Sequence, residues 1–238
     1  MAISKDKILK VHPVCFFDMD RTLIATNSGV SFMRYSFRRG KIGRWKVIRS
    51  MLDYFRYRFD LLNMEKAYRE TLKVLVGVRE EEFIQFCREW FEEMIPNLIY
   101  PQAIDFIRQH QAKGETAVII SNATTYVVEP LARHLEVAHC LGTRLEVSNG
   151  RFTGNYTEPL CFRSGKIFWA EKLMRELGGE FSAATFYTDS ITDLPLLERV
   201  RHQRIVNPDP QLRALARKRR WPVYEFRLPK PAGEAGRE

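Results

Sequence analysis

The sequence of 238 residues has few cysteines and no long hydrophobic run. Its four cysteines lie far apart without paired spacing, which argues against a disulfide framework and against a zinc site. The N-terminal stretch MAISKDKILKVHP has no apolar core long enough for a signal peptide, and no later stretch approaches the roughly 18 apolar residues of a membrane span. We therefore expect a soluble, cytoplasmic protein with reduced thiols.

Acidic residues are in deficit, because 29 Asp and Glu stand against 38 Lys and Arg, which gives a formal net charge of +9 at pH 7. This excess favours contact with anions such as phosphorylated metabolites, nucleic acid or an anionic membrane surface, but it does not choose among them. With 45% hydrophobic residues the chain is able to bury a sizeable core. Its length fits one large domain or a core domain with a smaller inserted module.

Short apolar runs alternate with helical patterns along most of the chain. The predicted strands are 14–17, 117–120, 184–187, 204–206 and 223–226, and the clearest helical patterns are 101–114, 124–137, 166–177 and 210–220. This alternation predicts an α/β fold, a Rossmann-like parallel sheet core with helices on both faces. The pair Asn149-Gly150 between alternating residues is a hairpin signal and predicts a small antiparallel excursion.

One interval lacks any convincing strand and shows helical periodicity instead, including a periodic apolar run over 48–62. We interpret residues 27–97 as an inserted all-helical cap, which would lie over the carboxyl end of the first strand. The core would then be discontinuous, made of residues 1–26 and 98–228. The small, polar tail over 229–238 is expected to be disordered.

Polar side chains follow several predicted strands, at the sheet edge where an open α/β fold binds its ligands. Asp18 and Asp20 follow the first strand, and a second pair of carboxylates follows a later one at Asp189 and Asp193. The other polar groups expected at this edge are two hydroxyls, an amide and an ammonium, from Thr22, Ser121, Asn122 and Lys166.

Each of these groups also has an ordinary structural explanation. Aspartates are common in turns that end a strand, and the polar residues 121–124 fit the N-cap of a following helix. Asp189 and Asp193 fit the first turn of another helix, where acids are stabilising. Lys166 fits a solvent-exposed lysine, although a cation in the first turn of a helix costs about 0.3–1 kcal/mol unless an anion binds there.

Taken together, the groups put four carboxylates, one ammonium, two hydroxyls and a helix N-terminus at one edge of one sheet. Concentrated carboxylates repel each other unless a cation lies among them, and hard oxygen ligands that are open to water and phosphate suit magnesium. We therefore predict a Mg²⁺ site at which an aspartate attacks phosphorus.

At these residues the sequence resembles the superfamily of haloacid dehalogenase-like phosphohydrolases. The segment DMDRT matches its Asp-x-Asp-x-Thr motif, Ser121 matches the second motif, Lys166 the third, and YTDSITDLP the paired-aspartate fourth, so the resemblance covers roughly residues 14–226. A helical cap between the first two motifs is similar to the subgroup that contains phosphoserine phosphatase. The segments DSITDLPLLE and NPDPQLRALARKRRWPV look like histidinol-phosphate phosphatases and their relatives.

This resemblance implies a phosphoric monoester hydrolase. Asp18 would be the nucleophile that forms an aspartyl-phosphate, and Asp20 would protonate the leaving alcohol and then activate the hydrolytic water. Mg²⁺ would be held by Asp18, the backbone carbonyl of Asp20 and Asp189, with Asp193 helping directly or through water.

The phosphate oxygens would lie in a cradle made by Ser121, the adjacent backbone amides at Asn122, and Lys166, whose groups neutralise charge in the transition state. Thr22 belongs to the same phosphate-binding set and is expected to orient the first loop.

The chain departs from the family pattern at positions that affect the substrate pocket. Phosphoserine phosphatases usually carry a glutamate where this chain has Asn27, which makes phosphoserine a doubtful substrate. Arg21 stands where glycine is commoner, and Asn122-Ala123 replaces the usual pair of glycines. We therefore treat Asn27 and Arg21 as candidate specificity residues, and we expect a small phosphorylated metabolite, an amino-alcohol phosphate such as histidinol phosphate or phosphoserine.

Residues 34–58 contain nine Lys or Arg and only Asp53 as an acid, with aromatic residues between them. They fit a solvated helical face, or a basic amphipathic helix that recruits an anionic membrane surface and a lysophospholipid-like phosphate. Nucleic-acid binding without catalysis is a further alternative, but it explains none of the four aspartates, so we do not expect nucleic acid as a partner. The sequence leaves the oligomeric state open.

Overall fold

The computed structural model describes residues 11–41 and 64–229, and its centre is a six-stranded sheet in which every strand is parallel to its neighbours. The strand order is β3-β2-β1-β6-β7-β8. The strands are β1 (Val14–Phe17), β2 (Thr116–Thr124), β3 (His139–Thr143), β6 (Thr185–Thr188), β7 (His202–Val206) and β8 (Val223–Tyr224). The predicted α/β fold with a Rossmann-like parallel sheet is confirmed.

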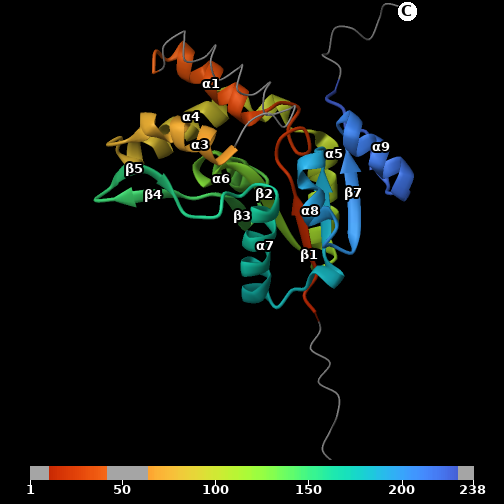
Figure 1. Cartoon of the computed structure of the whole chain (residues 1–238). Helices are drawn as coiled ribbons and strands as arrows, with labels where there is room; N and C mark the ends of the chain where they lie inside the picture. The colour runs from red at the N-terminus through yellow and green to blue at the C-terminus, as the bar shows by residue number, and fades with distance from the viewer. Residues whose placement is uncertain (1–10, 42–63, 230–238) are drawn as a thin grey trace, which may run out of the picture.

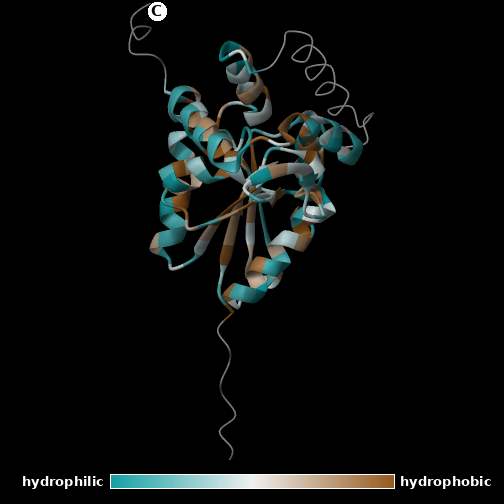
Figure 2. Cartoon of the chain, turned by 90° about the vertical axis from the view of Figure 1, so that its left-hand side faces the viewer, coloured by the Kyte–Doolittle hydropathy of each residue, from teal (hydrophilic) through white to brown (hydrophobic). Residues whose placement is uncertain are grey.

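Helices cover both faces of this sheet, because successive side chains of a strand point to opposite faces. In β1, Val14 and Phe16 pack into one hydrophobic cluster, and Cys15 and Phe17 pack into the other. Figure 2 shows the apolar strands between two layers of helices. The first cluster includes residues of α7 (Ser164–Leu177), α8 (Leu194–Leu197) and α9 (Pro210–Arg219), and the second includes residues of α5 (Pro101–Ala112) and α6 (Thr125–His134).

The strand order reverses beside β1. From β1 the chain proceeds outward through β2 to β3, and it then returns to build β6, β7 and β8 on the other side of β1. The junction of β1 and β6 is therefore the topological switch point, where ligands of open α/β sheets bind at the carboxyl ends of the strands. Two short 3₁₀ turns flank β6, at Phe181–Ala183 and Ile191–Asp193.

The described residues between β1 and α5 form helices and no named strand. These helices are α1 (Ser28–Arg38), α3 (Met64–Leu72), a 3₁₀ turn (Lys73–Leu75), α4 (Glu80–Met94) and a second 3₁₀ turn (Pro96–Leu98), and they lie beyond the upper end of the sheet in Figure 1. The predicted apolar run over 48–62 lies outside the described residues. The boundaries of a cap at 27 and 97 stay a prediction.

This insertion leaves and rejoins the core at one place. The Ala25 N–H donates to the Leu98 carbonyl (2.7 Å), and the Tyr100 N–H donates to the Leu23 carbonyl (3.0 Å). The entering and leaving segments thus pair with each other next to the carboxyl end of β1.

The predicted hairpin is present as the antiparallel pair β4 (Leu145–Ser148) and β5 (Arg151–Tyr156). Asn149 and Gly150 form its turn with φ of 51° and 70°, a left-handed conformation that these residue types tolerate. The hairpin reaches the insertion, since Gly77 N–H donates to the Phe152 carbonyl (2.9 Å) and Phe152 N–H donates to the Val78 carbonyl (3.0 Å). This pairing fixes the loop before α4 against β5.

Two strands differ from the prediction by more than two residues. Strand β3 was not among the predicted strands, because HCLGT has a glycine and no sustained apolar run, and its pairing with β2 makes it a strand. Strand β2 continues to Thr124, so Ser121 and Asn122 lie inside it, in a stretch where the pairing with β3 is irregular between Ile120 and Thr124.

No helix in the described part of the chain is long and apolar enough to cross a membrane. The cytoplasmic location stays a prediction, and the disordered tail falls almost wholly on residues 230–238, outside the described residues.

Candidate active site

Two of the predicted aspartates flank the switch point of the sheet. Asp18 directly follows β1 and Asp189 directly follows β6, the neighbouring strand. The Asp18 N–H donates to the Tyr187 carbonyl (2.9 Å), which continues the parallel pairing of the two strands for one residue past β1. Both residues are 7% exposed. The chain topology therefore brings carboxylates that are far apart in sequence to one buried place.

A buried lysine joins these carboxylates. Lys166 lies in the first turn of α7, its residue is 3% exposed, and its Nζ donates to Asp18 Oδ1 (2.6 Å) and lies 2.7 Å from Asp193 Oδ1. The anion that offsets its unfavourable place at a helix N-terminus is thus supplied by these two carboxylates. The interpretation of Lys166 as a solvent-exposed lysine is wrong.

Asp193 is held from a second side by a residue that sequence reasoning missed. The Thr188 hydroxyl donates to Asp193 Oδ2 (2.6 Å) and accepts a hydrogen bond from the Ser190 N–H (3.2 Å). Asp193 itself is 2% exposed, so it does not serve as an exposed first-turn acid. The available signal for Thr188 was its place at the end of a strand, immediately before Asp189 in YTDS.

Asp20 is held by the beginning of α1. Its Oδ2 accepts a hydrogen bond from Asn27 Nδ2 (2.9 Å), and its Oδ1 accepts one from the Ser28 backbone N–H (2.9 Å). Asn27 is the N-cap of α1, and its Oδ1 accepts from the Val30 N–H (3.0 Å). Sequence reasoning did not include Ser28, although Asn-Ser at the start of a helical pattern is an N-cap signature.

Burial dominates the electrostatics of the cluster, since it raises the pKa of Asp18 to about 7 and raises the pKa values of Asp20 and Asp189. Neighbouring carboxylates raise the pKa of Asp189 further, and the positive charge of Arg21 opposes this rise. The positive charge of Lys166 opposes the rise in the pKa of Asp18. Burial alone would lower the pKa of Lys166, but the charges of Asp18 and Asp193 outweigh it and raise that pKa. The four carboxylates and Lys166 therefore form one interacting group.

The structure places the predicted phosphate-binding residues near the same edge with fewer contacts. The Ser121 hydroxyl is buried and accepts from the Ala123 N–H (3.2 Å), and the Asn122 carbonyl accepts from the Thr143 hydroxyl (3.2 Å). Within the described part of the chain, neither Ser121 nor Asn122 is hydrogen-bonded to the carboxylate group. Thr22 is fully buried and its Oγ1 has no hydrogen-bond partner among the described residues, so an orienting role is not visible in its contacts.

Arg21 adopts a φ of 57°, a left-handed conformation in which the family's glycine would be unstrained. Its N–H donates to the Thr26 carbonyl (3.2 Å), closing the turn after β1. Its positive charge opposes the rise in the pKa values of both Asp189 and Asp20. Arg21 therefore lies electrostatically within the site, and its role in specificity stays a prediction.

Close backbone packing explains why glycine precedes Lys166. A Cβ on Gly165 would lie 1.8 Å from the Leu160 carbonyl oxygen, so that only glycine lets the first turn of α7 approach the loop before it. Gly142 in β3 plays a similar part beside the second motif, because a Cβ there would lie 2.8 Å from the Ala123 carbonyl oxygen.

The ligand types fit a hard divalent cation. Asp18, Asp189 and Asp193 are buried and Asp20 is half-buried, while Lys166 bonds only Asp18 and Asp193 of the four. This leaves an excess of negative charge that burial makes costly, and oxygen ligands of this kind suit Mg²⁺. Within residues 11–41 and 64–229, no group of three His, Cys, Asp or Glu side chains is arranged to hold a metal ion. The predicted ligand set does not depend on such a group, because it includes the main-chain carbonyl of Asp20.

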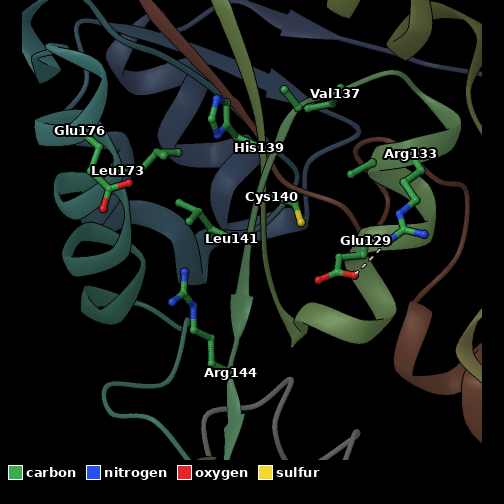
Figure 3. A pocket seen from close by; sticks show the side chains of 11 residues that line it. Glu129, Arg133, Val137, His139, Cys140, Leu141, Arg144, Leu173 and Glu176 are labelled. Carbon is green, nitrogen blue, oxygen red and sulfur yellow. Dashed lines mark ion pairs between the residues drawn. The ribbon is translucent and has the colours of Figure 1, made fainter. Parts of the chain in front are cut away.

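A separate cavity of about 430 Å³ lies beside β3, between α6 and α7 (Figure 3). Charged side chains from both helices and the loop after β3 line it, among them Glu129, Arg133, Arg144 and Glu176. None of the clustered carboxylates lines this cavity. The candidate active site is therefore defined by the carboxylate group at the switch point.

Comparison with known proteins points to one family. The family model of haloacid dehalogenase-like hydrolases matches residues 15–198. The chain is 31% identical to a probable phosphatase of Mycobacterium tuberculosis over 223 residues, which cover 92% of this chain and 77% of that protein. It is 30% identical to a histidinol-phosphatase of Neisseria meningitidis over 219 residues, which cover 90% of this chain and 99% of the relative.

A solved structure of a Bordetella pertussis protein of unknown function superposes with a TM-score of 0.82 at 29% identity, covering 90% of this chain and 98% of the other. The chain therefore belongs to the haloacid dehalogenase-like hydrolase family. The predicted enzyme class, a phosphoric monoester hydrolase, is confirmed at the level of the class.

Proposed function

We propose that this protein is a Mg²⁺-dependent phosphatase that hydrolyses a small amino-alcohol phosphate, with histidinol phosphate as the first candidate, through an aspartyl-phosphate on Asp18. The observation that carries the proposal is the buried group at the switch point, in which Lys166 bonds Asp18 and Asp193 while Asp20 is held separately by α1. A nucleophile and an acid that are two residues apart but differently held suit two different roles.

In the first step Asp18 attacks the phosphorus atom. Lys166 engages Oδ1 of Asp18, which leaves Oδ2 to form the new bond to phosphorus. The bond from phosphorus to the ester oxygen breaks, and its electron pair stays on that oxygen, which takes a proton from Asp20 and leaves as the alcohol. Lys166 stays charged because its pKa is raised, so it offsets negative charge on the phosphoryl oxygens.

In the second step Asp20, now a carboxylate, takes a proton from a water molecule. The water oxygen bonds to phosphorus, the bond from Asp18 to phosphorus breaks, and its electron pair returns to the Asp18 carboxylate. The products are the free alcohol and inorganic phosphate. The raised pKa of Asp20 supports the first role, because burial favours the protonated acid at the start of the cycle.

Mg²⁺ would be held by Asp18, the main-chain carbonyl of Asp20 and Asp189, with Asp193 acting through water because Lys166 and Thr188 already bond it. When bound, the ion would neutralise the excess of carboxylate charge and polarise a phosphoryl oxygen. Ser121 and the backbone amides at Asn122 would complete the phosphate cradle. The Thr22 hydroxyl, which has no hydrogen-bond partner among the described residues, is proposed as a further member of this phosphate-binding set.

The choice of substrate is supported by the Neisseria histidinol-phosphatase, which aligns over nearly its whole length. Phosphoserine is the second candidate, because the neutral Asn27 stands where phosphoserine phosphatases usually carry a glutamate. Helices α1, α3 and α4 are proposed as the cap that selects the alcohol. The lysophospholipid-like alternative relies on the basic segment 34–58, of which 42–58 lies outside the described residues.

The experiment is phosphate release from a panel of histidinol phosphate, phosphoserine, glycerol phosphate and a short-chain lysophosphatidate. Each compound is assayed with Mg²⁺ and with EDTA, for the wild type, Asp18→Asn and the surface control Asp105→Asn, which lies exposed on α5. We expect one compound to be preferred, with activity lost in EDTA and in Asp18→Asn but kept in Asp105→Asn. Activity that survives EDTA or Asp18→Asn would contradict the mechanism, and preference for the lysophosphatidate would replace the substrate.

A further inference from the structure

Asn27 makes two hydrogen bonds that join α1 to Asp20. Its Nδ2 donates to Asp20 Oδ2 at 2.9 Å, while its Oδ1 accepts from the Val30 N–H at 3.0 Å and so caps the helix. The oxygen of the amide group thus bonds the helix, and its nitrogen bonds the carboxylate. A side chain engaged at both ends is placed to orient Asp20 more than to contact a substrate.

The next residue completes the hold on Asp20. Ser28 is the first residue of α1, and its backbone N–H donates to Asp20 Oδ1 at 2.9 Å, so both carboxylate oxygens accept from the beginning of one helix. Because the two donors come from adjacent residues, they fix the plane of the carboxyl group as well as its position. A carboxyl group with one donor would rotate about that single bond.

Helix α1 is itself anchored on α4. Trp90 Nε1 donates to the Ser31 hydroxyl at 3.1 Å, and both residues are buried. Phe32 packs its ring against Phe83, Phe86 and Trp90 of α4 with centroids 5.5–6.0 Å apart. The place of Asn27 relative to the sheet is therefore set by packing within the insertion.

We propose that Asn27 is a positioning residue that aims Asp20 at the leaving-group oxygen, so that α1 controls proton donation to the alcohol. This inference rests on the proposed function, in which Asp20 is the acid. The proposed positioning role replaces the expectation that Asn27 contacts the substrate and determines specificity. The effect of Asn27 should then depend on how much the leaving group needs a proton.

A leaving group that is a poor base needs little help from an acid, whereas an alkoxide needs protonation as the bond breaks. Hydrolysis of an alkyl phosphate should therefore depend on Asn27, and hydrolysis of 4-nitrophenyl phosphate should depend on it much less. A residue that only stabilises the fold would affect both substrates alike.

Two variants separate the donor from the helix cap. Asn27→Ser keeps a good N-cap acceptor but lacks the long amide that reaches Asp20, and Asn27→Ala lacks both functions. The matched control is Ser36→Ala, which removes a hydrogen bond to the Phe32 carbonyl (2.8 Å) within the same helix, away from Asp20. The kcat and KM of each are measured on the preferred alkyl phosphate and on 4-nitrophenyl phosphate, together with Tm.

We expect kcat on the alkyl phosphate to fall on the order of 10- to 100-fold in both Asn27 variants, with a loss below about 3-fold on 4-nitrophenyl phosphate and KM within about 2-fold. The Tm of Asn27→Ala should fall by about 2–4 °C, and that of Asn27→Ser should stay within about 1 °C of the wild type. Ser36→Ala should keep the kcat ratio of the two substrates.

Three results would overturn the inference while leaving the proposed function intact. They are wild-type kcat in Asn27→Ser, an equal loss on both substrates, and a change confined to KM, which would return Asn27 to substrate binding. A wild-type protein that hydrolyses neither compound would instead overturn the proposed function, and this inference with it.

Discussion

Asp18 and Asp20 are two residues apart in the sequence, yet different parts of the molecule hold them. Asp18 is bonded by Lys166 of α7 and by the backbone of β6, which both belong to the sheet and its helices. Asp20 is bonded by Asn27 and Ser28, at the start of the insertion. The core thus holds the proposed nucleophile in place, whereas the start of the inserted segment holds the proposed acid.

This division separates two requirements of phosphate ester hydrolysis. The attack on phosphorus is the same for every phosphomonoester, and the groups proposed for it sit on strands and helices with buried, short contacts. Protonation of the leaving-group oxygen depends on where the alcohol lies. The proposed acid, Asp20, is hydrogen-bonded to the start of α1, one of the helices that would surround that alcohol.

Lys166→Met should give the largest effect because it removes the buried cation on the core side. Breaking a buried ion pair leaves uncompensated carboxylates, so the free energy of unfolding should fall by about 3–5 kcal/mol, and kcat should fall on the order of 100- to 1,000-fold. Urea denaturation and phosphate release measure the two losses. Lys172→Met, on the exposed side of the same helix, is the control, and a Lys166→Met protein as stable as the control would contradict the buried pair.

The pH dependence of stability should reveal the buried Asp18. Burial raises its pKa from 3.8 to about 7, so the folded state binds this proton more tightly than the unfolded chain does. Its stabilising effect is complete below about pH 4 and is lost as the pH rises to about 7. In EDTA, Asp18→Asn should therefore gain stability relative to the wild type over this window, by up to about 4 kcal/mol.

The measurement is the difference in unfolding free energy between the two proteins, at intervals from pH 4 to pH 8. A difference that stays flat, or that changes in the wild type's favour, would show that Asp18 ionises at least as readily in the folded state as in the unfolded chain, which contradicts the raised pKa. Added Mg²⁺ should shrink the difference at neutral pH, because a bound cation favours the ionised carboxylate.

Gly165→Ala tests the backbone packing that positions Lys166. The added Cβ meets the Leu160 carbonyl oxygen at 1.8 Å, so the first turn of α7 or its preceding loop must move, at a cost of roughly 2–4 kcal/mol and with a loss of activity. Gly114→Ala is the matched control, because its φ is 76° and no atom lies within 4 Å of the new Cβ. It should cost only about 1 kcal/mol and leave kcat unchanged. Equal costs for the two variants would contradict the close approach at Gly165.

Trp90→Phe and Trp169→Phe compare the two sides with the same chemical change. Each variant removes one hydrogen bond donated by an indole N–H, from Trp90 to the Ser31 hydroxyl (3.1 Å) or from Trp169 to the Pro159 carbonyl (2.8 Å). Each should cost about 1–2 kcal/mol of stability. Of the two, only Trp90→Phe should lower the ratio of alkyl to 4-nitrophenyl phosphate hydrolysis, since Trp90 contacts α1 and Trp169 bonds the loop before α7. The same ratio in both variants would remove the distinction between the core side and the insertion side.

The sequence alone was sufficient to predict the elements that carry a strong local signal. The apolar run of β1, the turn at Asn149-Gly150 and the helix that ends at Leu177 all have the expected places. The carboxylates and Lys166 were predictable as a group, because parallel strands bring polar groups that follow them to one edge. Strand β3 was not predictable in this way, since its identity comes from pairing with β2.

Contacts across long sequence distances were also beyond sequence reasoning. The burial of Lys166 depends on Asp18, which is 148 residues earlier in the chain, so no local pattern distinguishes it from a surface lysine. Asn27 was predicted as a specificity residue, and the pattern gave no sign that its amide is shared between Val30 and Asp20. Thr188 lies one residue beyond the predicted strand 184–187, and only the fold shows its hydrogen bond to Asp193.

The paired segments around Ala25 and Tyr100 have a consequence for how such an enzyme diversifies. Two backbone hydrogen bonds of 2.7 and 3.0 Å join the entering and leaving segments of the insertion. The insertion is therefore a closed loop attached to the sheet at one place. The entropy of closing a loop rises only slowly with its length. Insertions of other lengths and compositions could occupy the same junction at small cost to the sheet, so one inherited chemistry for phosphorus is compatible with many different alcohols.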